Sequence, residues 1–95
     1  MENLVVGQRV ILLKSVLGKP VGSFGFVVET YPDFDDSNLT GATIVFSGGR
    51  YDGFSVKEQS YFLEVGDIDP RYSMYEFKNV GQLHVDYRNG YWDFS

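Results

Sequence analysis

The chain of 95 residues contains no cysteine and only one histidine. Without cysteine it can form neither a disulfide framework nor a thiolate metal site, and a single histidine excludes any site built on a histidine pair. We therefore expect no metal and no cofactor. A chain this short and without disulfides depends on its hydrophobic core, or on a partner, for stability.

Long hydrophobic runs are also absent. The longest nearly uncharged apolar run, Val10 to Leu13, is far shorter than the roughly 20 residues that a membrane-spanning helix needs. The segment from Met1 to Gly7 lacks the basic region and apolar core of a secretory signal. We expect a cytoplasmic protein with no membrane partner.

Positive charge is scarce. Eight Lys and Arg residues stand against thirteen Asp and Glu residues, which gives a net charge of −5. Most of the acidic residues fall in the middle of the chain, between residues 29 and 76. This balance disfavours indiscriminate binding to phosphate backbones.

Aromatic residues and glycine are plentiful instead. Hydrophobic residues make up 43% of the chain and aromatic residues 17%, which is enough burial capacity for one packed domain over residues 1–95. Eleven glycines divide the chain into short segments, a pattern typical of small all-β or mainly β folds.

Segments rich in β-branched and aromatic residues predict strands at 9–14, 25–31, 42–47, 50–54 and 61–65. Gly48-Gly49 predicts a two-residue hairpin turn in which Phe46 faces Tyr51 and Thr43 faces Phe54. Ser55 followed by Glu58 matches a capping box and predicts one short helical turn.

The C-terminal segment allows two interpretations. Asn89-Gly90 between β-rich arms is a strong hairpin signal, so we predict a β-hairpin over residues 83–94, with Asp86 facing Asp93 at an electrostatic cost. A helix from Asn79 to Tyr91 is the alternative, because Val80, Leu83 and Tyr87 then share one face.

Two short motifs carry a family resemblance. Val6-Gly7-Gln8-Arg9-Val10 has the spacing G-x-x-V, and Gly22-Ser23-Phe24-Gly25-Phe26-Val27 has the spacing G-x-x-G-x-V. With a hairpin, a helical turn and a closing strand after them, residues 6–65 resemble KOW-type and related SH3-like small barrels. The resemblance implies a small barrel core at 4–65, with residues 66–95 as an extension packed on it. It also implies a binding module for proteins or nucleic acids, since such barrels are rarely enzymes.

We find no catalytic motif. His84 is the only histidine, no G-x-S-x-G sequence is present, and His84 is interpreted as a structural surface residue. The excess of aromatic residues predicts that some lie at the surface, where Tyr and Trp beside Arg are common interface anchors. The candidate binding residues are Arg50, Tyr51, Phe54, Arg71, Tyr72 and Trp92.

Our first hypothesis is therefore a non-enzymatic module that binds another protein, with homodimerisation as one route. A second is a nucleic-acid-binding barrel that uses basic residues with Phe24 or Tyr51 for base stacking, the basic residues being Arg9, Lys14, Lys19 and Arg50. A third is an acidic inhibitor that mimics nucleic acid, as some small phage proteins do.

Overall fold

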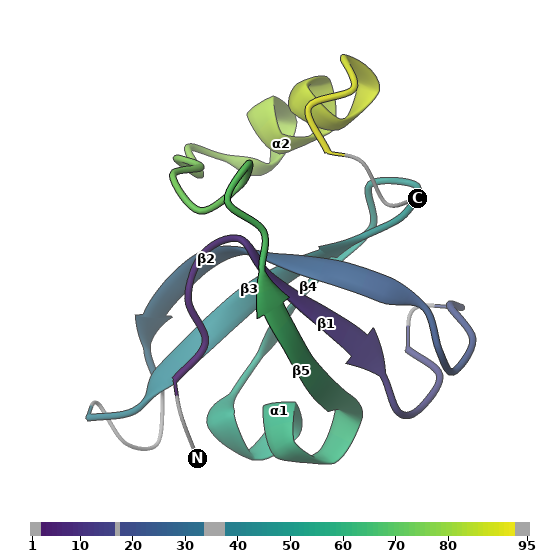
Figure 1. Ribbon diagram of the computed structural model, residues 1–95, viewed down its shortest axis with the longest axis vertical. Helices are drawn as coiled ribbons and strands as arrows, with labels where there is room; N and C mark the ends of the chain where they lie inside the picture. The colour runs from purple at the N-terminus through teal and green to yellow at the C-terminus, as the bar shows by residue number, and fades with distance from the viewer. Residues whose placement is uncertain (1–2, 17, 34–37, 93–95) are drawn as a thin grey trace.

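The computed structural model describes residues 3–16, 18–33 and 38–92, and in these ranges the chain is mainly β. It forms a five-stranded antiparallel sheet with two short helices. In chain order the elements are β1 (Gln8–Leu12), β2 (Phe24–Pro32), β3 (Thr40–Phe46), β4 (Tyr51–Phe54), α1 (Val56–Phe62), β5 (Leu63–Ile68) and α2 (Val80–Arg88) (Figure 1).

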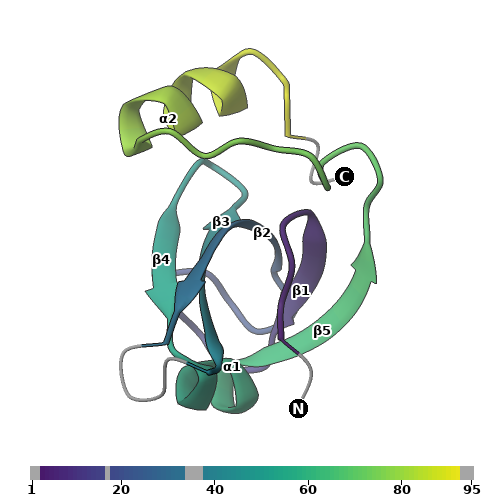
Figure 2. The same ribbon diagram turned by 90° about the vertical axis from the view of Figure 1, so that its left-hand side faces the viewer.

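The strand order in the sheet is β4-β3-β2-β1-β5. The sheet curls, with α1 below its strands and α2 above them (Figure 2). It is not closed into a barrel, because within the described ranges the edge strands β4 and β5 do not pair with each other. The five predicted strands are confirmed, with ends that differ by at most three residues.

The hairpin between β3 and β4 has a different register from the predicted one. Its loop contains three residues: the amide of Phe46 donates to the carbonyl of Arg50 at 2.7 Å, and Gly48 and Gly49 both have positive φ, at 88° and 80°. Tyr51 therefore faces Val45, so the predicted pairing with Phe46 is wrong by one residue. Since a slip of one residue exchanges the faces of a strand, Tyr51 lies on the face of Val45.

The predicted capping box at the start of α1 is confirmed. The hydroxyl of Ser55 accepts from the amide of Glu58 at 3.2 Å, and the carboxylate of Glu58 accepts from the amide of Ser55 at 3.1 Å. The buried carboxylate of Asp33 accepts from the amide of Val56 at 2.9 Å. These groups satisfy amides at the start of α1. The helix runs to Phe62, so β5 starts two residues later than predicted.

The predicted C-terminal hairpin is wrong, and the helical alternative is found. Asn79 begins α2, its side chain accepting from the amide of Gln82 at 2.8 Å. At the other end Gly90 has a φ of 81°, its amide donates to the carbonyl of Tyr87, and the amide of Tyr91 donates to the carbonyl of Asp86. These two bonds form a Schellman motif, so Asn89-Gly90 ends a helix. Residues 93 and 94 of the predicted hairpin lie outside the described residues.

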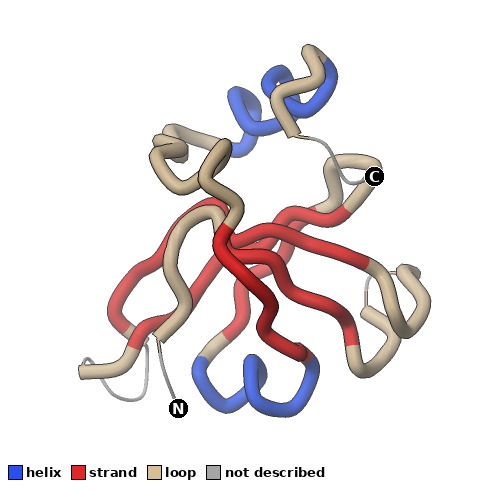
Figure 3. The backbone as a smooth tube through the Cα atoms, in the orientation of Figure 1, coloured by secondary structure: helices blue, strands red, loops and turns tan. Residues whose placement is uncertain are grey.

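Two hydrophobic clusters occupy the two faces of the sheet. The first contains Leu4, Val10, Leu12, Val27, Ala42, Ile44, Phe46, Phe54 and Leu63. The second joins Phe26, Val28 and Val45 of the sheet to Tyr72, Tyr75, Leu83 and Trp92 of the C-terminal segment. Figure 3 shows the loop that leads from β5 to α2. As a result β3 is covered on both faces.

Both helices in the described part of the chain are too short to cross a bilayer.

Candidate functional site

The structure buries three of the six candidate binding residues. Phe54 belongs to the first cluster, and Tyr72 and Trp92 belong to the second, with the rings of Tyr72 and Trp92 4.5 Å apart. Their exposed fractions are 2%, 3% and 4%, so they offer no surface to a partner. The prediction that these three aromatics are exposed is wrong: Phe54 packs against Phe46 and Phe62 on the first face of the sheet, and Tyr72 and Trp92 pack on Phe26 on the second. Arg50, Tyr51 and Arg71 remain at the surface.

Arg71 is engaged within its own turn. Its guanidinium forms an ion pair with Asp69 at 2.7 Å and lies 5.0 Å from the centre of the Tyr72 ring. The hydrogen bonds from the Arg71 side chain hold the pKa of Asp69 below its ordinary value. Arg71 therefore stabilises the loop between β5 and α2. It lies away from Arg50 and Tyr51, the other two exposed candidates.

Arg50 and Tyr51 lie in a groove between the β3–β4 hairpin and α2. Two adjoining cavities of about 400 and 160 Å³ form this groove and share Gly48, Gly49 and His84. We call it the hairpin groove; its lining residues are Gly48, Gly49, Arg50, Tyr51, His84, Tyr87 and Arg88.

The two walls of the hairpin groove are joined by a direct hydrogen bond. The amide of Gly48 donates to the hydroxyl of Tyr87 at 2.6 Å. A Cβ atom at Gly49 would lie 3.5 Å from the Tyr87 ring, so the helix side chain packs closely on the turn. This contact fixes the position of α2 relative to the hairpin, and thereby the width of the groove.

An aromatic pair lies within the groove. The rings of Tyr51 and His84 are 5.8 Å apart in an edge-to-face arrangement. Tyr51 is 38% exposed and His84 is half-buried, so the pair is ordered by its own contact and still accessible. The one-residue difference in hairpin register makes this possible, because it places Tyr51 on the face that α2 covers.

The charged side chains along the groove are basic. Arg50 and Arg88 line it, and Arg88 follows His84 by one helical turn. At the hairpin turn, the ammonium of Lys19 lies 3.3 Å from the hydroxyl of Ser47. The hairpin turn is thus flanked by cations in a chain whose net charge is −5.

Three residues of this groove were not among the sequence candidates. His84 was interpreted as structural, and Tyr87 and Arg88 were not singled out. The spacing His84, Tyr87, Arg88 places all three on neighbouring positions of a helix surface, but only if residues 79–91 are helical. This spacing has no such meaning if residues 83–94 form a β-hairpin.

The basic residues of the nucleic-acid hypothesis are divided among three places. Arg9 lies over the ring of Phe24, at 5.0 Å, beside a cavity of about 360 Å³. Lys14 lies 4.5 Å from the ring of Tyr61, near α1. Only Lys19 and Arg50 come together, at the hairpin.

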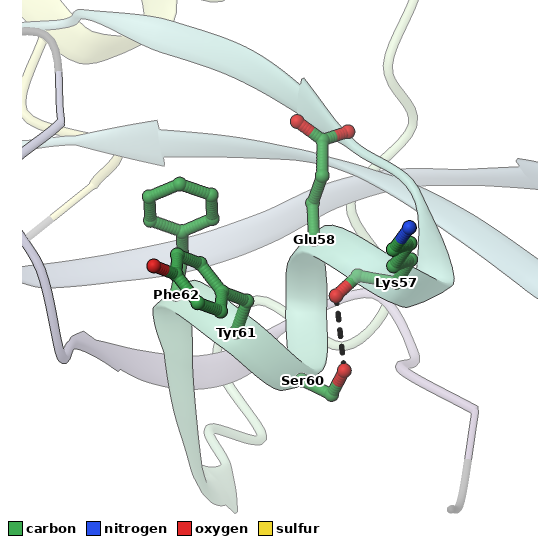
Figure 4. Close-up of a pocket in the computed structure, with 5 residues that line it drawn as sticks. All are labelled: Lys57, Glu58, Ser60, Tyr61 and Phe62. Atoms are coloured by element: carbon green, nitrogen blue, oxygen red, sulfur yellow. Dashed lines mark hydrogen bonds between the residues drawn. The ribbon is translucent and has the colours of Figure 1, made fainter.

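Another cavity, of about 530 Å³, lies along α1. Its described lining residues all belong to that helix and include Tyr61 and Phe62 (Figure 4). Ser60 is turned back on the helix, where its hydroxyl donates to the carbonyl of Lys57. Within the described ranges, its other lining residues are the charged side chains of Lys57 and Glu58.

A further cavity of about 520 Å³ lies on the opposite side of α2 from the hairpin and contains Tyr75 and Asp86. The Tyr75 hydroxyl donates to the Asp86 carboxylate at 2.8 Å, and Gln82 donates to the other oxygen at 2.9 Å. Burial, followed by the hydrogen bond to Asp86, raises the pKa of Tyr75 above its ordinary value. This phenol therefore stays protonated and acts as a structural donor.

Among residues 3–16, 18–33 and 38–92, no group of three or more His, Asp or Glu side chains is placed to hold a metal ion. No family model, no curated protein and no solved structure matches this chain.

Proposed function

We propose that this protein is a non-enzymatic interaction module that binds another protein in the hairpin groove. The observation that carries the proposal is the accessible Tyr51 ring, held against His84 between two walls joined by the Gly48–Tyr87 hydrogen bond. A pre-ordered aromatic side chain binds with a smaller loss of conformational entropy than a mobile one.

The composition of the groove supports binding to a protein. Tyr and Arg are the residues most enriched at interface positions that contribute strongly to affinity, and Arg50 and Tyr51 are adjacent here. His84 contacts an aromatic ring, and no Ser, Thr, Asp or Glu side chain in the described part of the chain lines the groove beside it. A general base needs such a neighbour, or a substrate hydroxyl, within hydrogen-bond reach.

We propose further that the fold is an open relative of the KOW-type and SH3-like barrels. Three features support this: the strand order β4-β3-β2-β1-β5, the short helix between β4 and β5, and the curl of the sheet. In this interpretation the C-terminal segment is the addition that builds one wall of the binding groove.

The proposal is tested by selecting peptides from a random displayed library on the immobilised protein. Peptides that bind the unaltered chain should lose affinity by about tenfold or more for Tyr51→Ala, as expected for an aromatic hot spot. Tyr61→Ala is the matched control, because Tyr61 is also an exposed tyrosine but lies on α1. Equal losses of affinity in the two variants would refute a binding site at the hairpin groove. So would selected peptides whose affinity neither substitution changes.

A nucleic-acid-binding function is the second candidate, favoured by the approach of Lys19 and Arg50 beside Tyr51. It predicts binding of single-stranded RNA or DNA at about 50 mM salt and a steep loss at about 200 mM. Absence of binding at the lower salt concentration would remove it.

The nucleic-acid-mimic hypothesis receives less support. A mimic needs carboxylates spaced like phosphates along one face, whereas six carboxylates here make local contacts in different parts of the fold. These are Glu29, Asp33, Asp52, Glu58, Asp69 and Asp86.

A further inference from the structure

The hairpin groove has the opposite charge from the chain as a whole. Its two charged lining residues are Arg50 and Arg88, and Lys19 flanks the turn, so three of the eight Lys and Arg residues gather around it. The remaining surface carries the acidic excess that gives the net charge of −5. An anionic ligand would be attracted to this groove and repelled elsewhere.

Acidic side chains on the neighbouring elements have other partners. On α2, Asp86 receives hydrogen bonds from Tyr75 and Gln82 on the side away from the hairpin. On the sheet, Glu29 accepts from the hydroxyl of Thr43 at 3.0 Å. Asp52 accepts from the amide of Gly53 at 2.8 Å. None of these carboxylates lines the groove.

The two glycine amides of the turn are used within the chain, so we assign recognition in the groove to its side chains. The amide of Gly48 is used by Tyr87, and the amide of Gly49 donates to the carbonyl of Phe46. Arg guanidinium groups bind carboxylates through paired, charge-assisted hydrogen bonds. Arg50 and Tyr51 line one of the two joined cavities, Arg88 lines the other, and His84 lines both.

We infer that the occupant of the hairpin groove is an acidic, extended segment of a partner protein, with carboxylates at Arg50 and Arg88 and an apolar side chain against Tyr51. This inference rests on the proposed function and names the chemistry of its partner. A long polyanion such as RNA fits less well, because Arg9 and Lys14 lie apart from the groove and the chain as a whole has a net charge of −5.

The test uses two fluorescent peptides that differ only in charge: one alternates Asp with Leu and Gly, and the other carries Lys at the Asp positions. Their affinities for the full chain are measured by anisotropy at about 50 mM and about 200 mM salt, since charge-driven binding weakens with ionic strength. The protein variants are Arg50→Glu, Arg88→Glu and Lys19→Glu. Lys57→Glu, on α1, is the control with the same change of charge. Circular dichroism checks that each variant folds.

We expect the Asp peptide to bind and the Lys peptide not to bind. Arg50→Glu and Arg88→Glu should each weaken binding by about tenfold or more, whereas Lys57→Glu should leave it unchanged. Equal binding of the two peptides, or equal effects of Lys57→Glu and Arg50→Glu, would overturn the inference.

Three further outcomes separate this inference from the proposed function. Library peptides that depend on Tyr51 but are uncharged and insensitive to Arg50→Glu would overturn the acidic partner and leave the protein-binding function in place. If oligonucleotides bind more tightly than the Asp peptide, and Arg50→Glu weakens that binding, both the acidic partner and the protein-binding function would be overturned. Dimerisation of the unaltered chain that Arg50→Glu abolishes would also overturn the inference, because the occupant would then be a second copy.

Discussion

At the scale of single residues, Gly7 holds the C-terminal segment against the sheet. Its amide donates to the carbonyl of Val27 at 2.8 Å, and its carbonyl accepts from the amide of Asp69 at 2.9 Å. Its φ is 87°, and an added Cβ atom would lie 2.6 Å from the backbone nitrogen of Ser73. Only glycine allows this close approach of two backbones.

Replacing Gly7 with alanine should therefore destabilise the protein more than the same change at Gly22. Gly22 also has positive φ, but its added Cβ would meet nothing within 4 Å, so Gly22→Ala carries only backbone strain, about 1 to 2 kcal/mol. Gly7→Ala adds the backbone clash, and we expect it to cost at least about 1 kcal/mol more. Urea unfolding of both variants measures the difference; equal losses of stability would contradict the contact.

The Asp69–Arg71 ion pair predicts that the stability of the fold depends on pH. Because the pKa of Asp69 is lowered in the folded chain, the pair stabilises the fold above the unfolded pKa of about 3.9. That contribution disappears as pH falls through the folded pKa. Arg71→Ala should raise the pKa of Asp69 toward its ordinary value, measured by NMR titration of the carboxyl carbon. An unchanged titration curve would show that Arg71 is not the cause.

The six binding candidates illustrate what a sequence can show about single residues. Aromatic excess signals that a small domain exposes some rings, yet it does not say which ones. Tyr72 and Trp92 are buried because α2 and the preceding loop place them on Phe26, with ring centres 4.9 and 5.6 Å away. That packing depends on contacts across the whole chain, which local composition does not encode.

At the scale of elements, α2 carries the main discrepancy between sequence and structure. Asn-Gly supplies a positive φ both in a hairpin turn and at the end of a helix, so the local signal at Asn89-Gly90 is the same for the two. The cap at Asn79 and the burial of Leu83 favour the helix. The capping-box pattern at Ser55 fits no comparable alternative structure, and the sequence predicted it correctly.

The hairpin between β3 and β4 was ambiguous in a similar way. Two consecutive glycines suit a two-residue turn and also a three-residue turn, and nothing local distinguishes them. The difference decides which face Tyr51 occupies. Composition alone singles out Arg50 and Tyr51 as candidates, whereas the proximity of His84 and Arg88 to them depends on both the correct register and the helix.

Because α2 packs on the sheet through one face, we predict very different losses of stability when two of its residues are replaced. Leu83 is fully buried in the second cluster, and Val85, two positions later, is exposed. Leu83→Ala should cost about 2 to 5 kcal/mol, because it leaves a cavity against the sheet, whereas Val85→Ala should change stability by less than about 1 kcal/mol. Thermal unfolding followed by circular dichroism checks both; similar costs would contradict the placement of the helix.

At the scale of the whole molecule, the sheet has a hydrophobic cluster on each face, and the second face is covered by the C-terminal segment. That segment both completes the fold and supplies one wall of the hairpin groove. The proposed binding function and the stability of the fold therefore both depend on α2: we predict that loss of Leu83 packing also weakens ligand binding, although Leu83 does not line the groove.

The central claim is that ligands bind between the hairpin and α2. It is tested most directly by adding the Asp peptide to isotopically labelled protein and following the backbone amides by NMR. We predict that the largest shifts fall on residues 47–51 and 84–88, with little change along α1 and β5. Shifts centred on α1 or β5, or none at all with a peptide shown to bind, would contradict the claim.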